Sequence, residues 1–286
     1  MTDQAIPRSS ERLTKRIQGH EFPTLGFGTF KLSGDACRRA VTKALQTGYR
    51  HIDTARMYEN EEMVGLGIRD SGLERREFFV TSKVWWEDLS PKAIRSEVEA
   101  SLKALQTDYL DLVLIHWPNP EFSIQKAVET FQELKDSGKI HLYGVSNFTP
   151  SLFEEAARYG EIFCNQVEYH PFLGQQQLLE VLRRHDSALI AYSPLAQGDV
   201  IENLNLKEIG EKHGKSPGQV ALRWLVEQDN VFAIPRSSKP EHIESNFDIF
   251  DFALDEADRQ RIAALPKDRR QVNPGFAPAW ENENQA

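Results

Sequence analysis

The sequence predicts an α/β fold: a (β/α)8 TIM barrel with an N-terminal β-hairpin and a C-terminal loop tail. Eight short runs rich in apolar residues alternate with segments whose apolar residues recur every three or four positions, as on one face of a helix. The runs are nearly continuous in apolar character, as in residues 110–115, which is typical of parallel strands covered on both faces. Roughly eight strand–helix units in 286 residues match the size of one barrel, typically about 250 residues.

Each part of the chain has its own signal. Residues 1–14 are polar and mixed, and we expect a flexible N-terminal tail there before a single domain at 15–286. Residues 15–23 predict a hairpin that turns at Gly19. Residues 266–286 lack a periodic pattern and predict the loop tail. The predicted strands are 24–30, 49–53, 78–83, 110–116, 141–147, 162–168, 188–193 and 231–236.

A doubly wound sheet is the alternative to the barrel. That fold would be favoured by a glycine-rich phosphate loop after the first strand. Gly26 and Gly28 begin such a pattern, but Lys31 stands where the third glycine is required. The fingerprint therefore fails, and the barrel remains the better prediction.

Composition and charge exclude several classes of protein. Hydrophobic residues make up 40% and charged residues 27%, so the chain has enough apolar material to fold. No apolar run approaches the ~18 residues of a membrane span, and the net charge of −9 disfavours binding to nucleic acid. Cys37 and Cys164 lack zinc-ligand spacing, and the first twenty residues lack the apolar segment of a secretory signal. We therefore expect a cytoplasmic protein without a metal, a membrane partner or a nucleic-acid partner.

Four side chains of different chemistry follow three successive predicted strands. Asp53, Lys83 and His116 come at the ends of their strands, and Tyr58 lies in the loop after Asp53. Because the carboxyl ends of barrel strands meet at one mouth, we expect these four side chains to converge there. They are the candidate catalytic residues.

An acid, a phenol, an amine and an imidazole form a proton-delivery unit. A phenol has a pKa of about 10, and a nearby ammonium lowers that pKa because it favours the phenolate. We expect Lys83 to act on Tyr58 in this way while Asp53 pairs with the ammonium. His116 is suited to orient a substrate carbonyl, so the set fits general-acid catalysis on a C=O group whose carbon receives hydride. Each residue alone also fits a structural role, and their joint occurrence favours catalysis.

The later strand ends carry groups that fit a hydride carrier. Ser146, Asn147 and Gln166 offer the donors and acceptors that match a nicotinamide carboxamide. Tyr192 is an aromatic platform on which the nicotinamide ring can stack.

The last predicted strand leads into an anion site. Ser238 and Glu241 have the spacing of a capping box, and Pro240 falls in the first turn of the helix that it predicts. Arg236 and Lys239 flank this helix start. The cationic pair and the helix N-terminus together predict binding of a phosphate group.

Eight segments carry motifs that resemble those of the aldo-keto reductase family, and the resemblance covers roughly residues 15–282. They are GYRHIDTA (48–55), YENE (58–61), SKVW (82–85), DYLDL (108–112), HWP (116–118), GVSNF (144–148), NQVE (165–168) and IPRS (234–237). The segment 276–281 is similar to the chain end of bacterial 2,5-diketo-D-gluconate reductases of the B type, which also reduce methylglyoxal.

This resemblance implies a monomeric barrel that reduces aldehydes or ketones with NADPH, including small dicarbonyls, keto-sugars and aromatic aldehydes. It implies that Tyr58 is the proton donor, that Lys83 and Asp53 tune it, and that His116 orients the substrate. The implied cofactor residues are Ser146, Asn147, Gln166, Tyr192, Ser193, Leu195, Arg236, Ser237, Ser238, His242 and Asn246. The implied substrate pocket contains Phe30, Trp85 and Trp117, with Phe276 and Trp280 of the tail closing it.

Two positions depart from the family pattern. His242 stands where arginine is usual, and a histidine is mostly neutral at physiological pH. We therefore expect a weaker hold on a 2′-phosphate and reduced discrimination against NADH. Phe30 stands where many members have tryptophan, which leaves more room above the nicotinamide.

Two other functions are weighed against carbonyl reduction. Lys83 could serve a Schiff-base aldolase, although the neighbouring Tyr58 and His116 and the phosphate site argue against it. A non-catalytic module that senses the cofactor is the other alternative, and the four intact catalytic positions argue against it.

Overall fold

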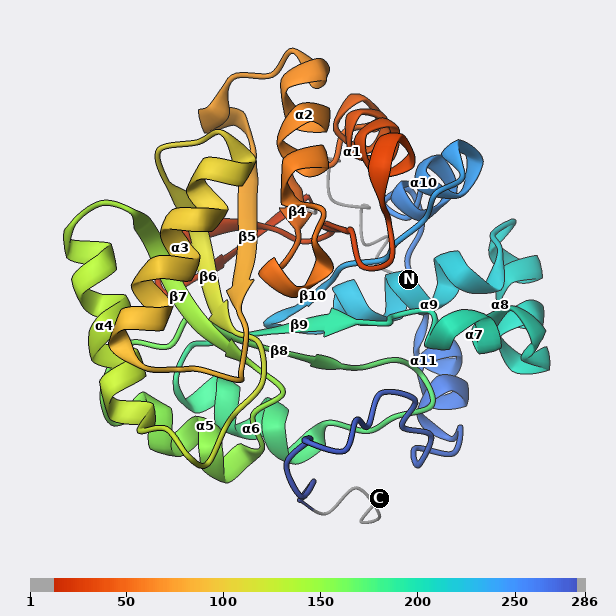
Figure 1. The fold of residues 1–286 in the computed structure, drawn as a ribbon. Helices are drawn as coiled ribbons and strands as arrows, with labels where there is room; N and C mark the ends of the chain where they lie inside the picture. The colour runs from red at the N-terminus through yellow and green to blue at the C-terminus, as the bar shows by residue number, and fades with distance from the viewer. Residues whose placement is uncertain (1–12, 282–286) are drawn as a thin grey trace.

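The computed structural model describes residues 13–281 and confirms the predicted barrel (Figure 1). Eight strands form one parallel sheet in the order β3 to β10. The sheet closes because Leu25, just before β3, forms a parallel bridge with Ala233 of β10, and the Gly26 N–H donates to the Ala233 carbonyl at 2.8 Å. The strands are β3 (Phe27–Gly28), β4 (His51–Asp53), β5 (Phe79–Val84), β6 (Leu110–Ile115), β7 (Ile140–Ser146), β8 (Cys164–Glu168), β9 (Ala188–Tyr192) and β10 (Val231–Ala233).

The predicted hairpin is also present, as β1 (Thr14–Ile17) and β2 (His20–Pro23). Gln18 and Gly19 both have positive φ, at 48° and 79°, as a tight two-residue hairpin turn requires. The hairpin includes Thr14, which the sequence places in the N-terminal tail. Residues 1–12 of that predicted tail lie outside the described residues.

Helices surround the sheet (Figure 1). Several of them begin at a residue whose side chain caps the first turn, as in α3, where the Ser90 hydroxyl accepts from the Ala93 N–H and Pro91 occupies the first turn. The α-helices are α1 (Gly34–Thr47), α2 (Glu61–Ser71), α3 (Pro91–Leu105), α4 (Ile124–Asp136), α5 (Pro150–Ala157), α6 (Gln176–Arg184), α7 (Asp199–Glu202), α8 (Leu204–His213), α9 (Pro217–Glu227), α10 (Pro240–Phe247) and α11 (Glu256–Ala263). Short 3₁₀ helices are η1 (Arg56–Tyr58), η2 (Arg75–Glu77) and η3 (Ala196–Gly198).

The capping box predicted at Ser238 is wrong. The helix α10 begins at Pro240, and its N-cap is Lys239, which makes no side-chain cap. Ser238 is therefore one residue too early to cap. The Ser237 hydroxyl instead accepts from the Lys239 N–H at 3.1 Å, in a local turn that precedes the helix.

The two faces of each strand bury different clusters. Along β6, Leu112 and Leu114 belong to the cluster inside the barrel, whereas Val113 and Ile115 pack in the layer between strands and helices. Burial on both faces explains why the strand runs are nearly continuous in apolar character. Within residues 13–281, no helix has the length and apolar character that crossing a bilayer requires.

The hairpin covers the amino-terminal end of the barrel. The Phe22 ring lies 4.9 Å from the His51 ring and 4.7 Å from the Phe79 ring, measured between centroids. His51 is buried here, its Nε2 is 2.9 Å from the Thr81 hydroxyl, and its Nδ1 has no hydrogen-bond partner. Burial, together with the charge of Lys83, lowers the pKa of His51 to about 3.

This buried imidazole predicts a loss of stability in acid. The unfolded chain binds a proton at His51 below its ordinary pKa of about 6.5, whereas the folded chain does so only near 3, so the free energy of unfolding falls as pH drops through this window. The loss is about 2 kcal/mol at pH 5 relative to pH 7.5. Urea unfolding of wild type and His51→Gln at both pH values measures it. The variant should lose this part of the pH dependence, and parallel pH profiles would contradict the assignment.

Candidate active site

Lys83 is the centre of a buried polar cluster at the carboxyl end of the strands. Its ammonium Nζ donates to Asp53 Oδ1 at 2.6 Å, to the Thr54 carbonyl at 2.9 Å and to the Tyr58 hydroxyl at 3.4 Å. The Lys83 side chain is fully buried. The three hydrogens of the ammonium thus have three oxygen partners, which compensates for removing the charge from water.

Neighbouring strand ends bring these groups together. Asp53 ends β4 and pairs in register with Thr81 of β5, so Lys83 emerges two residues further along the adjacent strand. Tyr58 ends the 3₁₀ helix η1 that follows β4. The three predicted residues therefore converge as expected.

His116 completes the set. Its ring lies 5.6 Å from the Tyr58 ring and 5.2 Å from the Trp85 ring, edge to face in both cases. Its Nδ1 is buried and makes no hydrogen bond within the described residues. The imidazole of His116 thus lies directly beside the Tyr58 phenol, as the sequence predicts.

Burial dominates the electrostatics of this cluster. Burial and then the negative charge of Asp53 raise the pKa of Tyr58 well above 10, so the predicted lowering by Lys83 is wrong in direction. The physical reason is that Asp53 neutralises the ammonium while the Tyr58 hydroxyl is removed from water, although the side chain as a whole is half-buried. Burial lowers the pKa of Lys83, and this shift is opposed by Asp53. Burial and the Lys83 charge also hold the pKa of His116 well below 6.5. At neutral pH the site therefore presents a protonated phenol and a neutral imidazole.

A row of amide and hydroxyl groups lies beside this cluster, at the ends of β7, β8 and β9. The Gln166 side-chain amide donates to Asp53 Oδ2 at 2.7 Å and so links the row to the ion pair. The Ser146 hydroxyl donates to the backbone carbonyl of Gln166 at 2.7 Å, and the Tyr192 hydroxyl donates to Asn147 Oδ1 at 2.7 Å. The structure thus gathers the three residues for which a carboxamide contact is predicted, together with Tyr192, for which ring stacking is predicted.

The remaining predicted cofactor residues lie around the last two strand ends. Ser193 and Leu195 follow β9. Arg236 is exposed after β10, and its guanidinium donates to the Phe30 and Lys31 carbonyls at 3.0 and 3.2 Å rather than pointing to the α10 N-terminus. The other four predicted residues occupy the connection into α10 or α10 itself: Ser237, Ser238, His242 and Asn246.

Aromatic rings surround the catalytic cluster. The Phe30 ring lies 5.0 Å from the Tyr58 ring. Phe276 of the tail lies 5.8 Å from Trp85 and 5.5 Å from Trp117, and it stacks on Trp86 at 4.4 Å. The tail therefore reaches the predicted substrate pocket.

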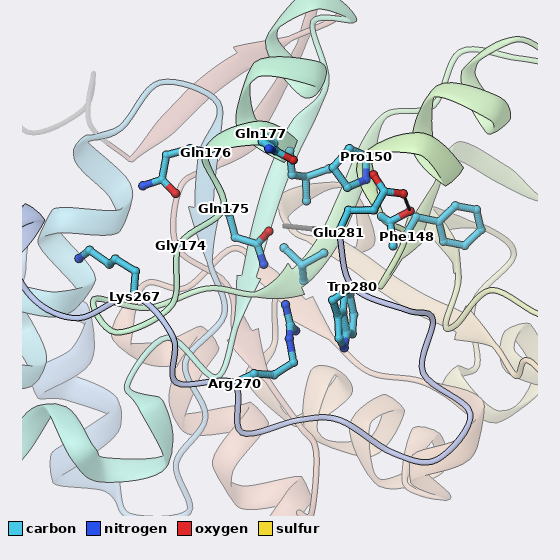
Figure 2. A pocket seen from close by; sticks show the side chains of 13 residues that line it. Phe148, Pro150, Gly174, Gln175, Gln176, Gln177, Lys267, Arg270, Trp280 and Glu281 are labelled. Atoms are coloured by element: carbon cyan, nitrogen blue, oxygen red, sulfur yellow. Dashed lines mark hydrogen bonds between the residues drawn. The ribbon is translucent and has the colours of Figure 1, made fainter. Parts of the chain in front are cut away.

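Trp280 lies near the same wall. Its ring is 6.2 Å from the Trp117 ring, and the Arg270 guanidinium lies 3.6 Å from the Trp280 ring centroid. Figure 2 shows these two side chains of the tail, Arg270 and Trp280, side by side.

Three residues near the site escape the sequence analysis as individual candidates. Asn60 donates to the Thr29 and Leu32 carbonyls at 2.9 Å and holds the loop that carries Tyr58. Glu168 is a buried carboxylate at the end of β8. Trp86 forms the stack with Phe276. The available signals were the polar YENE motif, the NQVE motif and the tryptophan doublet at 85–86.

Known proteins resemble this chain over most of its length. The model of the Aldo/keto reductase family matches residues 24–267. Glyoxal reductase of Bacillus subtilis is 44% identical over 268 residues, which cover 93% of this chain and 96% of the relative. Methylglyoxal reductase DkgB of Escherichia coli O157:H7 is 39% identical, covering 91% and 99%.

A solved structure agrees with these matches. The crystal structure of a candidate 2,5-diketo-D-gluconic acid reductase B superposes with a TM-score of 0.92 at 40% identity, covering 95% of this chain and 99% of the other. The family match extends over most of the chain, and the four candidate catalytic residues meet at one barrel mouth. This protein therefore belongs to the aldo-keto reductase family.

Proposed function

We propose that this protein reduces aldehydes and ketones to alcohols with NADPH, and that Tyr58 supplies the proton. The observation that carries this proposal is the Tyr58 hydroxyl, 3.4 Å from the buried Lys83 ammonium, which Asp53 pairs at 2.6 Å. The Tyr58 hydroxyl is protonated at neutral pH, as a general acid must be before it donates.

The chain's own residues divide the work of the reaction. His116, whose imidazole is neutral, hydrogen-bonds and orients the carbonyl oxygen of the substrate. NADPH, when bound, supplies the hydride that the carbonyl carbon accepts. Tyr58 donates its proton to the carbonyl oxygen, and the product is the alcohol. The Lys83–Asp53 pair holds the Tyr58 hydroxyl in position, with the ammonium 3.4 Å from it.

Several residues fit the cofactor. Ser146, Asn147 and Gln166 form the hydrogen-bonded row that would hold a carboxamide, and Tyr192 lies beside it with its hydroxyl on Asn147. The connection from β10 into α10 carries Arg236, Ser237 and Ser238, and α10 itself carries His242 and Asn246. The phosphate of the adenosine end would bind there.

The geometry disfavours a Schiff-base aldolase. A Schiff base requires the lysine nitrogen to reach a substrate carbonyl with a free electron pair. The Lys83 nitrogen is fully buried, and its directions are taken by Asp53, Thr54 and Tyr58.

The aromatic wall supports a small or planar carbonyl substrate. Phe30, Trp85, Trp117 and Phe276 offer apolar ring faces around Tyr58 and His116. Two curated relatives are named for reducing glyoxal and methylglyoxal, and a solved relative is named for diketogluconate. We include methylglyoxal, 2,5-diketo-D-gluconate and aromatic aldehydes among the proposed substrates.

The role of Tyr58 is tested by Tyr58→Phe. Removal of the hydroxyl should lower kcat with methylglyoxal by about 10²–10⁴-fold, because the proton donor is lost. Binding of NADPH, followed by quenching of tryptophan fluorescence, should stay within about twofold. Tyr159→Phe on the exposed surface is the matched control and should retain full activity. A Tyr58→Phe enzyme with near wild-type turnover would refute the role.

The cofactor preference is tested at His242. Wild type should prefer NADPH over NADH in kcat/KM, because Arg236 and its neighbours attract the 2′-phosphate. His242→Arg should raise that preference about three- to tenfold, since the arginine side chain carries a permanent positive charge that attracts the 2′-phosphate. The same change at the exposed His141, on the opposite end of the barrel, is the control. A wild-type enzyme that clearly favours NADH would overturn this assignment.

A further inference from the structure

Glu168 is a buried carboxylate that the proposed reaction does not use. It ends β8, pairs in register with Tyr192 of β9 and has 0% exposure. Its oxygens accept from His170 Nε2 at 3.0 Å and from the Gln271 and Val272 backbone N–H groups at 2.9 Å each. A charge at such depth is tolerated only when donors surround it, and these donors supply that compensation.

Most of these partners come from the C-terminal tail. Two consecutive main-chain amides point at one carboxylate, and the Arg270 guanidinium lies 3.8 Å from its Oε2. A carboxylate can accept from both amides and from His170 at the same time because both of its oxygens are acceptors. A glutamine there would have one acceptor oxygen and would turn an NH2 group toward the remaining donors.

The same stretch of tail, residues 269–272, also forms hydrogen bonds with the segment that follows Tyr192. The Gln271 side-chain amide donates to the Ala196 carbonyl at 3.0 Å and to Asp199 Oδ2 at 3.1 Å. Arg269 Nη1 donates to Asp199 Oδ2 at 2.9 Å. Residues 269–272 are therefore held between Glu168 and the start of the segment 196–202, which lies on the proposed cofactor side.

Beyond Val272 the tail borders hollows rather than dense packing. Residues 275–279 line a groove of about 910 Å³ together with Trp86 and the segment 118–125. Trp280 and Glu281 line a second, smaller cavity of about 40 Å³, seen in Figure 2. Phe276 itself packs against Trp85, Trp86 and Trp117, so its place is set jointly by these rings and by the fixed points of the tail.

A second fixed point lies at the far end of the described tail. The Glu281 carboxylate accepts from the Thr149 hydroxyl at 2.7 Å and from the Ser151 hydroxyl at 3.1 Å. The Ser151 contact is exposed, whereas the Glu168 side chain is fully buried and accepts from two backbone N–H groups of the tail, so Glu168 is the stronger anchor.

We propose that Glu168 is a positioning residue: its buried carboxylate anchors the tail, sets the place of Phe276 in the substrate wall, and through Gln271 ties that wall to the segment beside the cofactor. The anchoring itself stands on the contacts above. Its catalytic consequence, selectivity for large over small carbonyl compounds, rests on the proposed function. Large aromatic aldehydes reach the tail, whereas methylglyoxal fits beside Tyr58 and His116.

Hydrogen exchange of the complete protein tests the anchor without turnover. In Glu168→Gln, amides of residues 268–281 should exchange at least about tenfold faster, because a hydrogen bond to a buried charge is lost. Asp111→Asn is the matched control, since that carboxylate also accepts from a backbone N–H and an arginine but lies at the other end of the barrel. Its tail should exchange as in wild type. Unchanged tail exchange in a folded Glu168→Gln protein would overturn the anchor.

Kinetics separate positioning from a general loss of stability. With saturating NADPH, Glu168→Gln should raise KM for 4-nitrobenzaldehyde about tenfold, while kcat and the KM for methylglyoxal change less than about threefold. A uniform fall in kcat for both substrates would contradict a positioning role. If the wild type reduces neither compound, the proposed function fails, and the exchange experiment still decides the anchor.

The link to the cofactor side has its own variant. Gln271→Ala keeps the backbone N–H groups on Glu168 but removes the contacts to Ala196 and Asp199. NADPH should dissociate about three- to tenfold faster in stopped-flow fluorescence, with tail exchange near that of wild type. An unchanged dissociation rate would show that the tail and the cofactor side are not coupled.

Discussion

The buried ion pair between Lys83 and Asp53 is the interaction on which the rest of the site depends. Two charges removed from water are tolerated only because every donor and acceptor nearby is turned toward them: Thr54 and Tyr58 face the ammonium, and Gln166 faces the second carboxylate oxygen. Removal of one partner alone would leave the other charge buried and unpaired, at a cost of about 3–5 kcal/mol. Asp53 contacts both Lys83, which lies beside Tyr58, and Gln166 of β8. The ion pair therefore joins the Tyr58 side of the site to the row of amide and hydroxyl groups.

The fold could be predicted from the sequence because the strands of a closed parallel sheet are buried on both faces and therefore appear as nearly continuous apolar runs. All eight strands lie within the predicted runs or within a residue of them. β3 and β10 are much shorter than predicted, since at the closure of the ring only bridges and single hydrogen bonds join the first and last strands. Pro240 correctly indicated the first turn of α10, but the predicted cap at Ser238 was wrong. The N-cap is Lys239, and the turn before the helix directs the Lys239 N–H to the Ser237 hydroxyl.

The site was predictable where position along a strand determines position in space. Asp53, Lys83 and His116 stand at strand ends, and strand ends of a barrel converge. The direction of the Tyr58 pKa was not predictable, because it depends on how far the hydroxyl is removed from water and on the neutralisation of Lys83. The NQVE motif marked Glu168, but its proposed role could not be predicted from the sequence. Two of its partners are backbone N–H groups of a tail without periodic pattern, and any sequence carries such groups.

The closure of the ring between Leu25 and Ala233 has a consequence for how the protein becomes active during synthesis. The proton-handling side chains all belong to the first half of the chain, and the row proposed to hold the cofactor belongs to the second. Neither half contains a complete ring, and contacts between chain ends are the slowest to form. The first half of the chain carries Asp53, Tyr58, Lys83 and His116 but lacks β8, which supplies Gln166, and β10, which closes the ring. The proposed site is therefore complete only once the last strand is in place.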